Sequence, residues 1–143
     1  MKWGEIQLAT LQKLFATDED MTFENLDSLL ENDDCRTYVQ GMVQVANEAI
    51  QLIKPHIMNM YEYDSTQEKY IKTTVEKIDD TYTKDTKLDL PYDACILIPL
   101  YMASQLMKDD DISLATQYRN EFEAGLDNLD INIENPSEVE NVW

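Results

Sequence analysis

Ten consecutive residues, ACILIPLYMA at positions 94–103, constrain the fold of this chain more than any other feature of its sequence. They are apolar on every face of a helix, and a helix of that kind is buried inside a protein or between subunits. Pro91 suits the first turn of such a helix, where its missing N–H does no harm. Pro99 lies inside the run and should bend it, because its ring clashes with the carbonyl group four residues back. The sequence therefore predicts a buried, bent central helix over residues 90–108.

Other segments carry apolar residues at helical spacing, and only 3 Gly and 4 Pro interrupt the 143 residues. We expect further helices over residues 3–15, 23–31, 36–54 and 112–128. The clearest apolar stripe, in the third of them, consists of Val39, Met42, Val43, Ala46, Ala49, Ile50 and Ile53. This length and pattern predict a mainly α fold, a small helical bundle around one core.

Proline and aspartate mark two of the expected helix ends. Pro55 should end the helix at residues 36–54, because the residue before a proline avoids the α region. Asp111 should cap the helix that begins at Ile112, because a carboxylate there accepts hydrogen bonds from backbone N–H groups and suits the helix dipole.

The segment from residue 56 to residue 89 permits two interpretations. Ser65 followed by Glu68 matches a capping box, and the apolar residues after it repeat at helical spacing. The β-branched residues of the same stretch, and the alternation in TYTKDTKLDL, favour strands instead. We expect a helix over residues 66–79 and an extended segment over residues 81–89. A β-ribbon across the whole segment is the alternative.

The charge is strongly unbalanced, with 29 acidic and 11 basic residues and a formal net charge of −18. Such a surface does not bind DNA by attraction, because Lys and Arg supply that affinity, and anionic membranes repel it. The charge keeps the protein soluble, or it marks a surface that avoids nucleic acid or meets a basic partner. No apolar stretch reaches transmembrane length, and the amphipathic N-terminus is unlike a secretory signal, so we expect a cytoplasmic protein.

The sequence holds no P-loop, nucleophile elbow or dinucleotide-binding glycine pattern. The single histidine, His56, has no nucleophile placed beside it by the sequence. Cys95 lies in the apolar run and is expected to be a buried thiol, although a disulfide with Cys35 stays open. Aspartate clusters occur at residues 33–34, 79–80 and 109–111. None matches a calcium-binding loop, and we expect them to cap helices and face solvent. We therefore expect no enzyme activity, no metal site and no cofactor.

Two segments are candidates for contact with partners. Residues 130–143 are acidic and without helical period, which predicts an extended tail, and the terminal tryptophan is a natural hydrophobic anchor. The candidate contact residues of the tail are Asp130, Ile131, Ile133, Pro136, Val139, Val142 and Trp143. A second candidate patch consists of Met58, Met60, Tyr61 and Tyr63. Flexible methionines beside tyrosines form an adaptable surface.

Several segments share a packing signature: LP at 90–91, LIPLYMASQL at 97–106, KDDD at 108–111, YRNEFE at 118–123, NEAI at 47–50 and WGEI at 3–6. On these segments, and over about half of the chain in all, the sequence resembles the head-to-tail connector, or adaptor, proteins of tailed bacteriophages. Longer members of that family carry a β-rich insertion between two core helices, at the place that residues 56–89 occupy in this chain.

The resemblance implies a structural virion protein whose residues 1–129 form a helical connector domain, with 56–89 as a variable, insertion-like segment. Its copies would form a ring, typically a dodecamer, below the portal protein. That ring would extend the DNA channel, let the genome pass without specific binding, and dock the stopper or tail proteins. The tail at 130–143 would grip the portal or neighbouring subunits. The protein would be located in the neck of the virion, and in the host cytoplasm during assembly, without a membrane.

A different class of function rests on the charge of −18 alone. An acidic interaction protein, such as a phage-encoded DNA mimic, would be a monomer or dimer. It would bind a basic host protein in a salt-sensitive manner.

Overall fold

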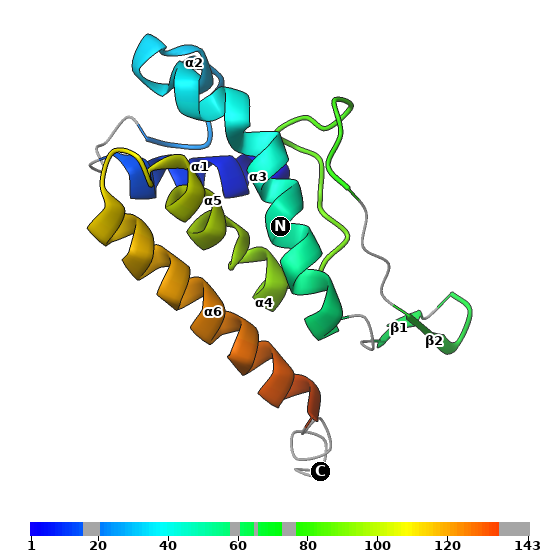
Figure 1. Ribbon diagram of the computed structural model, residues 1–143. Helices are drawn as coiled ribbons and strands as arrows, with labels where there is room; N and C mark the ends of the chain where they lie inside the picture. Colours follow the sequence, from blue (N-terminus) through cyan, green and yellow to red (C-terminus); the bar gives the residue numbers. More distant parts are fainter. Residues whose placement is uncertain (16–20, 58–60, 65, 73–76, 135–143) are drawn as a thin grey trace.

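The apolar run at the centre of the sequence forms two short helices, and the other helices surround them (Figure 1). The computed structural model describes residues 1–15, 21–57, 61–64, 66–72 and 77–134, and only the backbone within 61–64, 69–72 and 130–134. In chain order the elements are α1 (Trp3–Leu14), α2 (Leu26–Glu31), α3 (Asp33–Ile57), β1 (Tyr61–Asp64), β2 (Lys69–Lys72), α4 (Tyr92–Cys95), α5 (Ile98–Leu106) and α6 (Ile112–Glu134). The protein is therefore mainly α and is a small helical bundle, as the sequence predicted.

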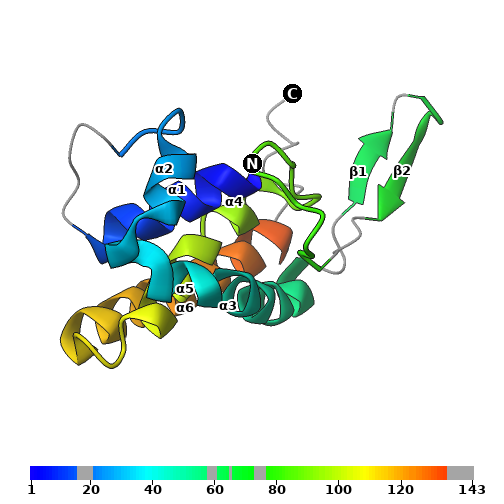
Figure 2. The same ribbon diagram turned by 90° about the horizontal axis from the view of Figure 1, so that it is seen from above.

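Helix α5 is the centre of the bundle and packs against α1, α3 and α6. In Figures 1 and 2, α3, α5 and α6 run side by side, and α1 crosses behind them. The side chains of Ile98, Met102 and Ala103 are completely buried. The prediction of a buried central helix is confirmed for α5.

Pro99 does not bend one continuous helix, because the chain leaves the helix before it reaches the proline. Helix α4 ends at Cys95, and a turn at Ile96 and Leu97 leads into α5, where Pro99 lies in the first turn. The carbonyl four residues before Pro99 belongs to Cys95, so the break falls where the proline ring would clash. In the first turn of α5 the missing N–H of Pro99 costs no hydrogen bond.

Helix α3 covers residues 33–57 and passes through Pro55, so the prediction that the proline ends it was wrong. The carbonyl that loses a partner there belongs to Gln51, which is exposed, so water can replace the missing bond. The buried face of α3 is formed by Met42, Ala46, Ala49, Ile50 and Ile53. Val43, which we expected in that stripe, is instead 40% exposed.

The middle of the chain is an antiparallel hairpin and not the expected helix over residues 66–79. Strand β1 pairs with β2 in the register Tyr61 to Lys72 and Asp64 to Lys69, so the β-ribbon alternative is confirmed for residues 61–64 and 69–72. Glu68, read from the sequence as part of a capping box, lies in the hairpin turn with a φ of 53°. That left-handed backbone suits a turn and is incompatible with the first turn of a helix.

Residues 81–89, expected to be extended, contain turns and one β-bridge between Lys87 and Lys2. This segment lies against the start of α1. The N–H groups of Trp3 and Gly4 donate to the carbonyls of Thr86 and Lys84 at 2.8 Å and 3.0 Å. The segment thereby satisfies backbone donors that the first turn of a helix leaves without partners.

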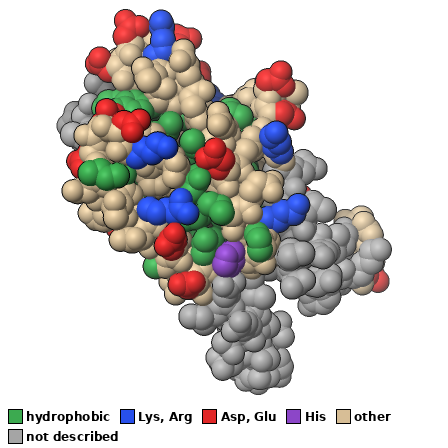
Figure 3. Space-filling view, in the orientation of Figure 1, with side chains coloured by type: hydrophobic (Ala, Val, Ile, Leu, Met, Phe, Trp, Pro, Cys, Tyr) green, Lys and Arg blue, Asp and Glu red, His purple; other side chains and the backbone are tan. Residues whose placement is uncertain are grey.

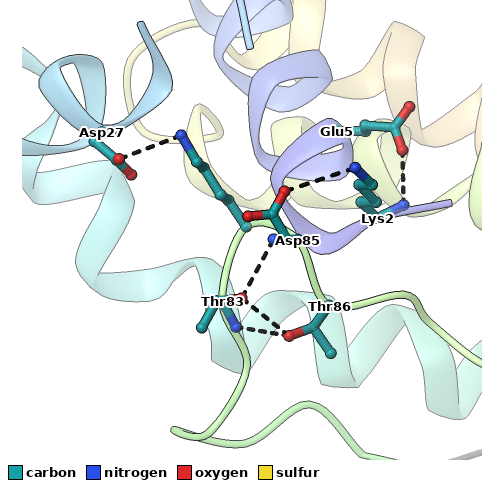
Figure 4. Close-up of polar contacts among 7 residues, drawn as sticks. Lys2, Glu5, Asp27, Thr83, Asp85 and Thr86 are labelled. Carbon is teal, nitrogen blue, oxygen red and sulfur yellow. Dashed lines mark hydrogen bonds and ion pairs between the residues drawn. The ribbon is translucent and has the colours of Figure 1, made fainter. Parts of the chain in front are cut away.

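Side chains reinforce this junction (Figure 4). Lys2 Nζ lies 3.6 Å from Asp85 Oδ1, and Lys84 Nζ lies 3.3 Å from Asp27 Oδ2. Each ammonium group also lies 5.4 Å from the centre of the Phe23 ring. Ion pairs as exposed as these contribute little individually, so the backbone hydrogen bonds are the main link between α1 and residues 81–89.

Helix α6 begins as predicted and ends later than predicted. The backbone N–H of Leu114 donates to Asp111 Oδ1 at 3.1 Å, so the expected cap is confirmed. The helix continues to Glu134, beyond the expected end at residue 128, and includes the first five residues of the segment expected to be an extended tail. The sequence has neither proline nor glycine between residues 126 and 134, so no helix-breaking residue ends α6 at residue 128.

A close approach of two backbones requires Gly4. A Cβ atom there would lie 2.8 Å from the Lys84 carbonyl oxygen and 2.6 Å from Lys84 Cβ. We expect Gly4→Ala to lower the free energy of unfolding by about 1–3 kcal/mol, because the segment at residues 81–89 must move away from α1. Urea denaturation followed by circular dichroism measures the change.

Gly41→Ala is the matched control, because a Cβ on that helix would meet only the terminal methyl of Leu106, at 3.1 Å. The helix propensity of alanine should offset that contact, with a gain of at most about 1 kcal/mol. Equal destabilisation by the two substitutions would show that the backbone contact of Gly4 has no special importance.

Candidate interaction surface

The contact residues predicted from the sequence lie at the edge of the described structure or outside it. Asp130, Ile131 and Ile133 are in the last turns of α6, where the backbone alone is described. Tyr61 and Tyr63 are on β1, also with the backbone alone. The remaining predicted residues, Met58, Met60, Pro136, Val139, Val142 and Trp143, lie outside the described residues. Both partner sites therefore stay predictions.

The aspartate clusters have local structural roles. Asp110 accepts a hydrogen bond from the Tyr38 hydroxyl, which ties the turn before α6 to α3. Asp79 accepts bonds from the hydroxyl and the backbone N–H of Thr81, and these two bonds lower its pKa. Asp33 lies 3.4 Å from Arg36 in the first turn of α3. In the part of the chain that the structure describes, no group of three or more His, Cys, Asp or Glu side chains could hold a metal ion.

The two thiols are held in their neutral form. Cys95 is completely buried, and burial raises its pKa to about 11. Burial, and then the charge of Asp34, also raises the pKa of Cys35. Both cysteines are unpaired. Because the thiolate is the reactive form, neither cysteine is suited to act as a nucleophile near neutral pH.

A shallow groove of about 830 Å³ runs along the outward side of α3. We call it the α3 groove. It is lined by Gln40, Val43, Gln44, Asn47, Glu48 and Gln51 of α3 and by Lys77, Ile78 and Asp79 of the segment that follows the hairpin. Clefts of roughly 300–1,000 Å³ are the size at which proteins seat ligands and side chains of partners.

The wall of the α3 groove opposite the helix, which we call the far wall, consists of residues 77–79 and is held in place by one side chain of α3. The amide of Asn47 makes two hydrogen bonds to the backbone of Ile78, accepting from its N–H at 2.8 Å and donating to its carbonyl at 2.9 Å. The side chain of Ile78 is then buried, with 1% of its surface exposed. Asn47 thus takes the place that a neighbouring strand would have beside this segment.

The α3 wall of the groove is poor in charge for so acidic a protein, whereas the facing segment carries Lys77 and Asp79. From residue 37 to residue 53 the helix contains one charged residue, Glu48. Its carboxylate accepts a hydrogen bond from the Tyr101 hydroxyl at 3.1 Å. Interface centres are depleted of charged residues relative to the remaining surface, so this face has the composition of a contact surface.

The Tyr101 hydroxyl lies in a small polar network between three helices. Burial, and then the charge and hydrogen bond of Glu48, raises the pKa of Tyr101, while Arg119 of α6 opposes the shift. The Arg119 guanidinium lies 5.1 Å from the centre of the Tyr101 ring, and its Nε is 3.2 Å from Glu123 Oε1. Figure 3 shows the face to which α3 and α6 contribute, with hydrophobic side chains gathered in its middle and charged side chains around them.

A second apolar surface lies on α4. Tyr92 is 66% exposed and Ile96 is 41% exposed. The N–H of Ile96 donates to the carbonyl of Tyr92 at 3.1 Å, so the two residues stand one helical turn apart on the same face. We call this pair the α4 ridge. Ile112, at the start of α6, is also exposed, with 67% of its surface accessible.

Sequence reasoning missed both surfaces. Ile96 of the α4 ridge lies in the run 94–103, which is apolar on all sides, and the pattern does not indicate which side lacks a neighbour. A usable signal was present in α3, where glutamines at positions 40, 44 and 51 surround Val43 in an otherwise acidic chain.

Comparison of the chain with protein-family models, with curated proteins and with solved structures found no match. Among the helices of the described residues, none has the length and apolar character that crossing a membrane requires.

Asn47 should be essential for the far wall of the α3 groove. We expect Asn47→Ala to lower the free energy of unfolding by about 1–3 kcal/mol, because it leaves two backbone groups of Ile78 without partners. Hydrogen exchange at the Ile78 amide should accelerate in the same variant. Gln44→Ala, on the same helix but exposed, is the control and should change stability by less than about 0.5 kcal/mol. An unchanged Ile78 amide in Asn47→Ala would contradict this assignment.

Proposed function

We propose that this chain is a structural subunit of the head-to-tail connector of a tailed bacteriophage. Its copies form a ring below the portal that extends the DNA channel and joins the head to the tail. The proposal rests on the resemblance of the packing segments and on the way those segments meet in the fold.

The observation that carries the proposal is the network around Tyr101. Its three members come from three of the resembling segments: Glu48 from residues 47–50, Tyr101 from 97–106 and Arg119 from 118–123. The hydroxyl of Tyr101 is bonded to Glu48, and its ring lies against Arg119. A fourth segment, residues 3–6, forms the start of α1, which also packs on α5. The residues that carry the resemblance thus form one packing unit, as expected if they define a shared fold.

The charge supports the same function. With 29 acidic and 11 basic residues, the net charge of −18 repels DNA phosphates and disfavours binding by counterion release. An acidic wall would let a genome slide through a ring without being held. The chemistry of the described residues adds no competing role, since the aspartates serve turns and caps and both thiols are buried.

Electron microscopy tests the proposal directly. The protein is incubated with the portal encoded in the same genome, and particles are imaged with the full chain and with a variant truncated after Glu134. We expect an additional ring of density on one end of the portal with the full chain. The truncated variant should dock more weakly, because it lacks the terminal anchor around Trp143.

A portal that gains no density at any protein concentration would contradict the connector function. If the chain instead remained a monomer or dimer that bound a basic DNA-binding protein in low salt, the function of an acidic DNA mimic would replace it.

A further inference from the structure

We propose that copies of this chain associate by extending the β1–β2 hairpin into a longer sheet, with β1 of one copy beside β2 of the next. The partner is a second copy of this chain, and the outer edges of the two strands make the contact. The inference stands on the hairpin alone and does not depend on the proposed connector function.

The hairpin is an arm that stands apart from the helices. In both Figure 1 and Figure 2 it projects to one side of the bundle. Its strands pack mainly on each other, and among the described residues they pair with no third strand. A two-stranded hairpin by itself is at best marginally stable in water. The outer edge of such a strand directs backbone N–H and C=O groups away from its partner and can accept a strand from another chain.

The two strands of the hairpin carry opposite charges. Strand β1 contains Glu62 and Asp64, whereas β2 contains Lys69 and Lys72. The remaining charged residue of the hairpin, Glu68, lies in the turn and belongs to neither edge. With two lysines and three carboxylates, residues 61–72 have a net charge of −1 in a chain of −18. The hairpin is thus a place where two copies can approach with little repulsion.

This division of charge selects one of the three ways in which two edges can pair. Two β1 edges would bring Glu62 and Asp64 of both copies together, and two β2 edges would bring four lysines together. Like charges opposite each other in a sheet are destabilising, whereas opposite charges are stabilising. Pairing of β1 with β2 of the next copy is the arrangement that places carboxylates beside lysines.

The register of the hairpin leaves one of these carboxylates without a lysine opposite it. Asp64 lies opposite Lys69, but Glu62 lies opposite Ile71. Alternate residues of a strand share a face, so Glu62, Asp64 and Lys69 occupy positions on one face of the hairpin. If the sheet continues into a second copy, Lys69 of that copy comes to the outer side of β1 on the same face. Glu62 then gains a lysine neighbour that its own hairpin does not place opposite it.

The contact joins copies head to tail, because each copy offers a different edge to each neighbour. Strands β1 and β2 are antiparallel within one copy. Copies that lie side by side in the same orientation therefore continue an antiparallel ladder. Such a contact produces a ring when the rotation closes and a filament when it does not, so we expect species larger than a dimer.

Charge reversal on one strand tests the pairing. The double variant Glu62→Lys with Asp64→Lys makes both strands basic, and Lys69→Glu with Lys72→Glu makes both acidic. In sedimentation velocity over a concentration series, wild type should form species larger than a dimer. Each double variant alone should associate about tenfold more weakly, because two cross-strand pairs change from attraction to repulsion. An equal mixture of the two double variants should regain the association of wild type.

Two further proteins separate contact between copies from the stability of a single hairpin. A variant with all four substitutions exchanges the charges of the two strands and keeps opposite charges within the hairpin, so it should associate like wild type. Lys54→Glu with Lys108→Glu is the matched control, because it changes the net charge equally at two exposed positions outside the hairpin. At physiological salt the control should also associate like wild type. Circular dichroism checks that every variant keeps its helices.

A disulfide identifies the strands that meet. Tyr63→Cys and Tyr70→Cys proteins, mixed and oxidised, should form a disulfide that joins one chain of each kind. Cys35 and Cys95 are buried and should not take part. If Tyr63→Cys instead formed a disulfide mainly with itself, two β1 edges would meet and the assignment would be wrong.

Three other outcomes would overturn the inference. The first is a wild-type chain that stays monomeric at every concentration. The second is association that persists unchanged in either double variant. The third is a loss of association that neither the mixture of double variants nor the fourfold variant restores.

Discussion

The burial of α5 on all its sides is the interaction on which the rest of this structure depends. The first six residues of this nine-residue helix, Ile98–Ala103, are apolar on every side, so the helix must be covered by several neighbours. Helices α1, α3 and α6 provide that cover. The positions of these three helices follow from this requirement, and so does the turn at Ile96 and Leu97 that lets the chain enter α5 without a clash at Pro99.

The same arrangement divides the remaining surface. Once α5 has used the inner faces of α1, α3 and α6, their outer faces are left to interact with solvent or with partners. The outer face of α6 carries Glu121, Glu123 and Asp127, whereas the outward side of α3 carries Glu48 alone between residues 37 and 53. Glu48 connects the two regions, because it lines the α3 groove and also binds Tyr101 of the central helix. A partner that touched Glu48 in the groove would therefore be linked to the core of the bundle through the hydrogen bond between Tyr101 and Glu48.

Local signals predicted the fold well, and tertiary contacts explain the failures. Asp111 caps α6 as expected, because a cap depends only on neighbouring backbone groups. The hairpin, which the sequence left as the alternative, ranked below a helix because the capping-box pattern ending at Glu68 is also compatible with a turn. The exposure of Tyr92, Ile96 and Val43 was missed because periodicity indicates a face and not its neighbour. The predicted partner residues of the tail lie either in the last turns of α6, where the backbone alone is described, or outside the described residues.

Native-state hydrogen exchange tests the central position of α5 most directly. The amides of α5 should exchange only when the whole protein unfolds, together with the buried turns of α3 and α6. The β1–β2 hairpin, which pairs with no other strand in the described residues, should exchange through a local opening of much lower free energy. If the amides of α5 exchanged as readily as those of the hairpin, α5 would not be the helix around which the bundle is organised.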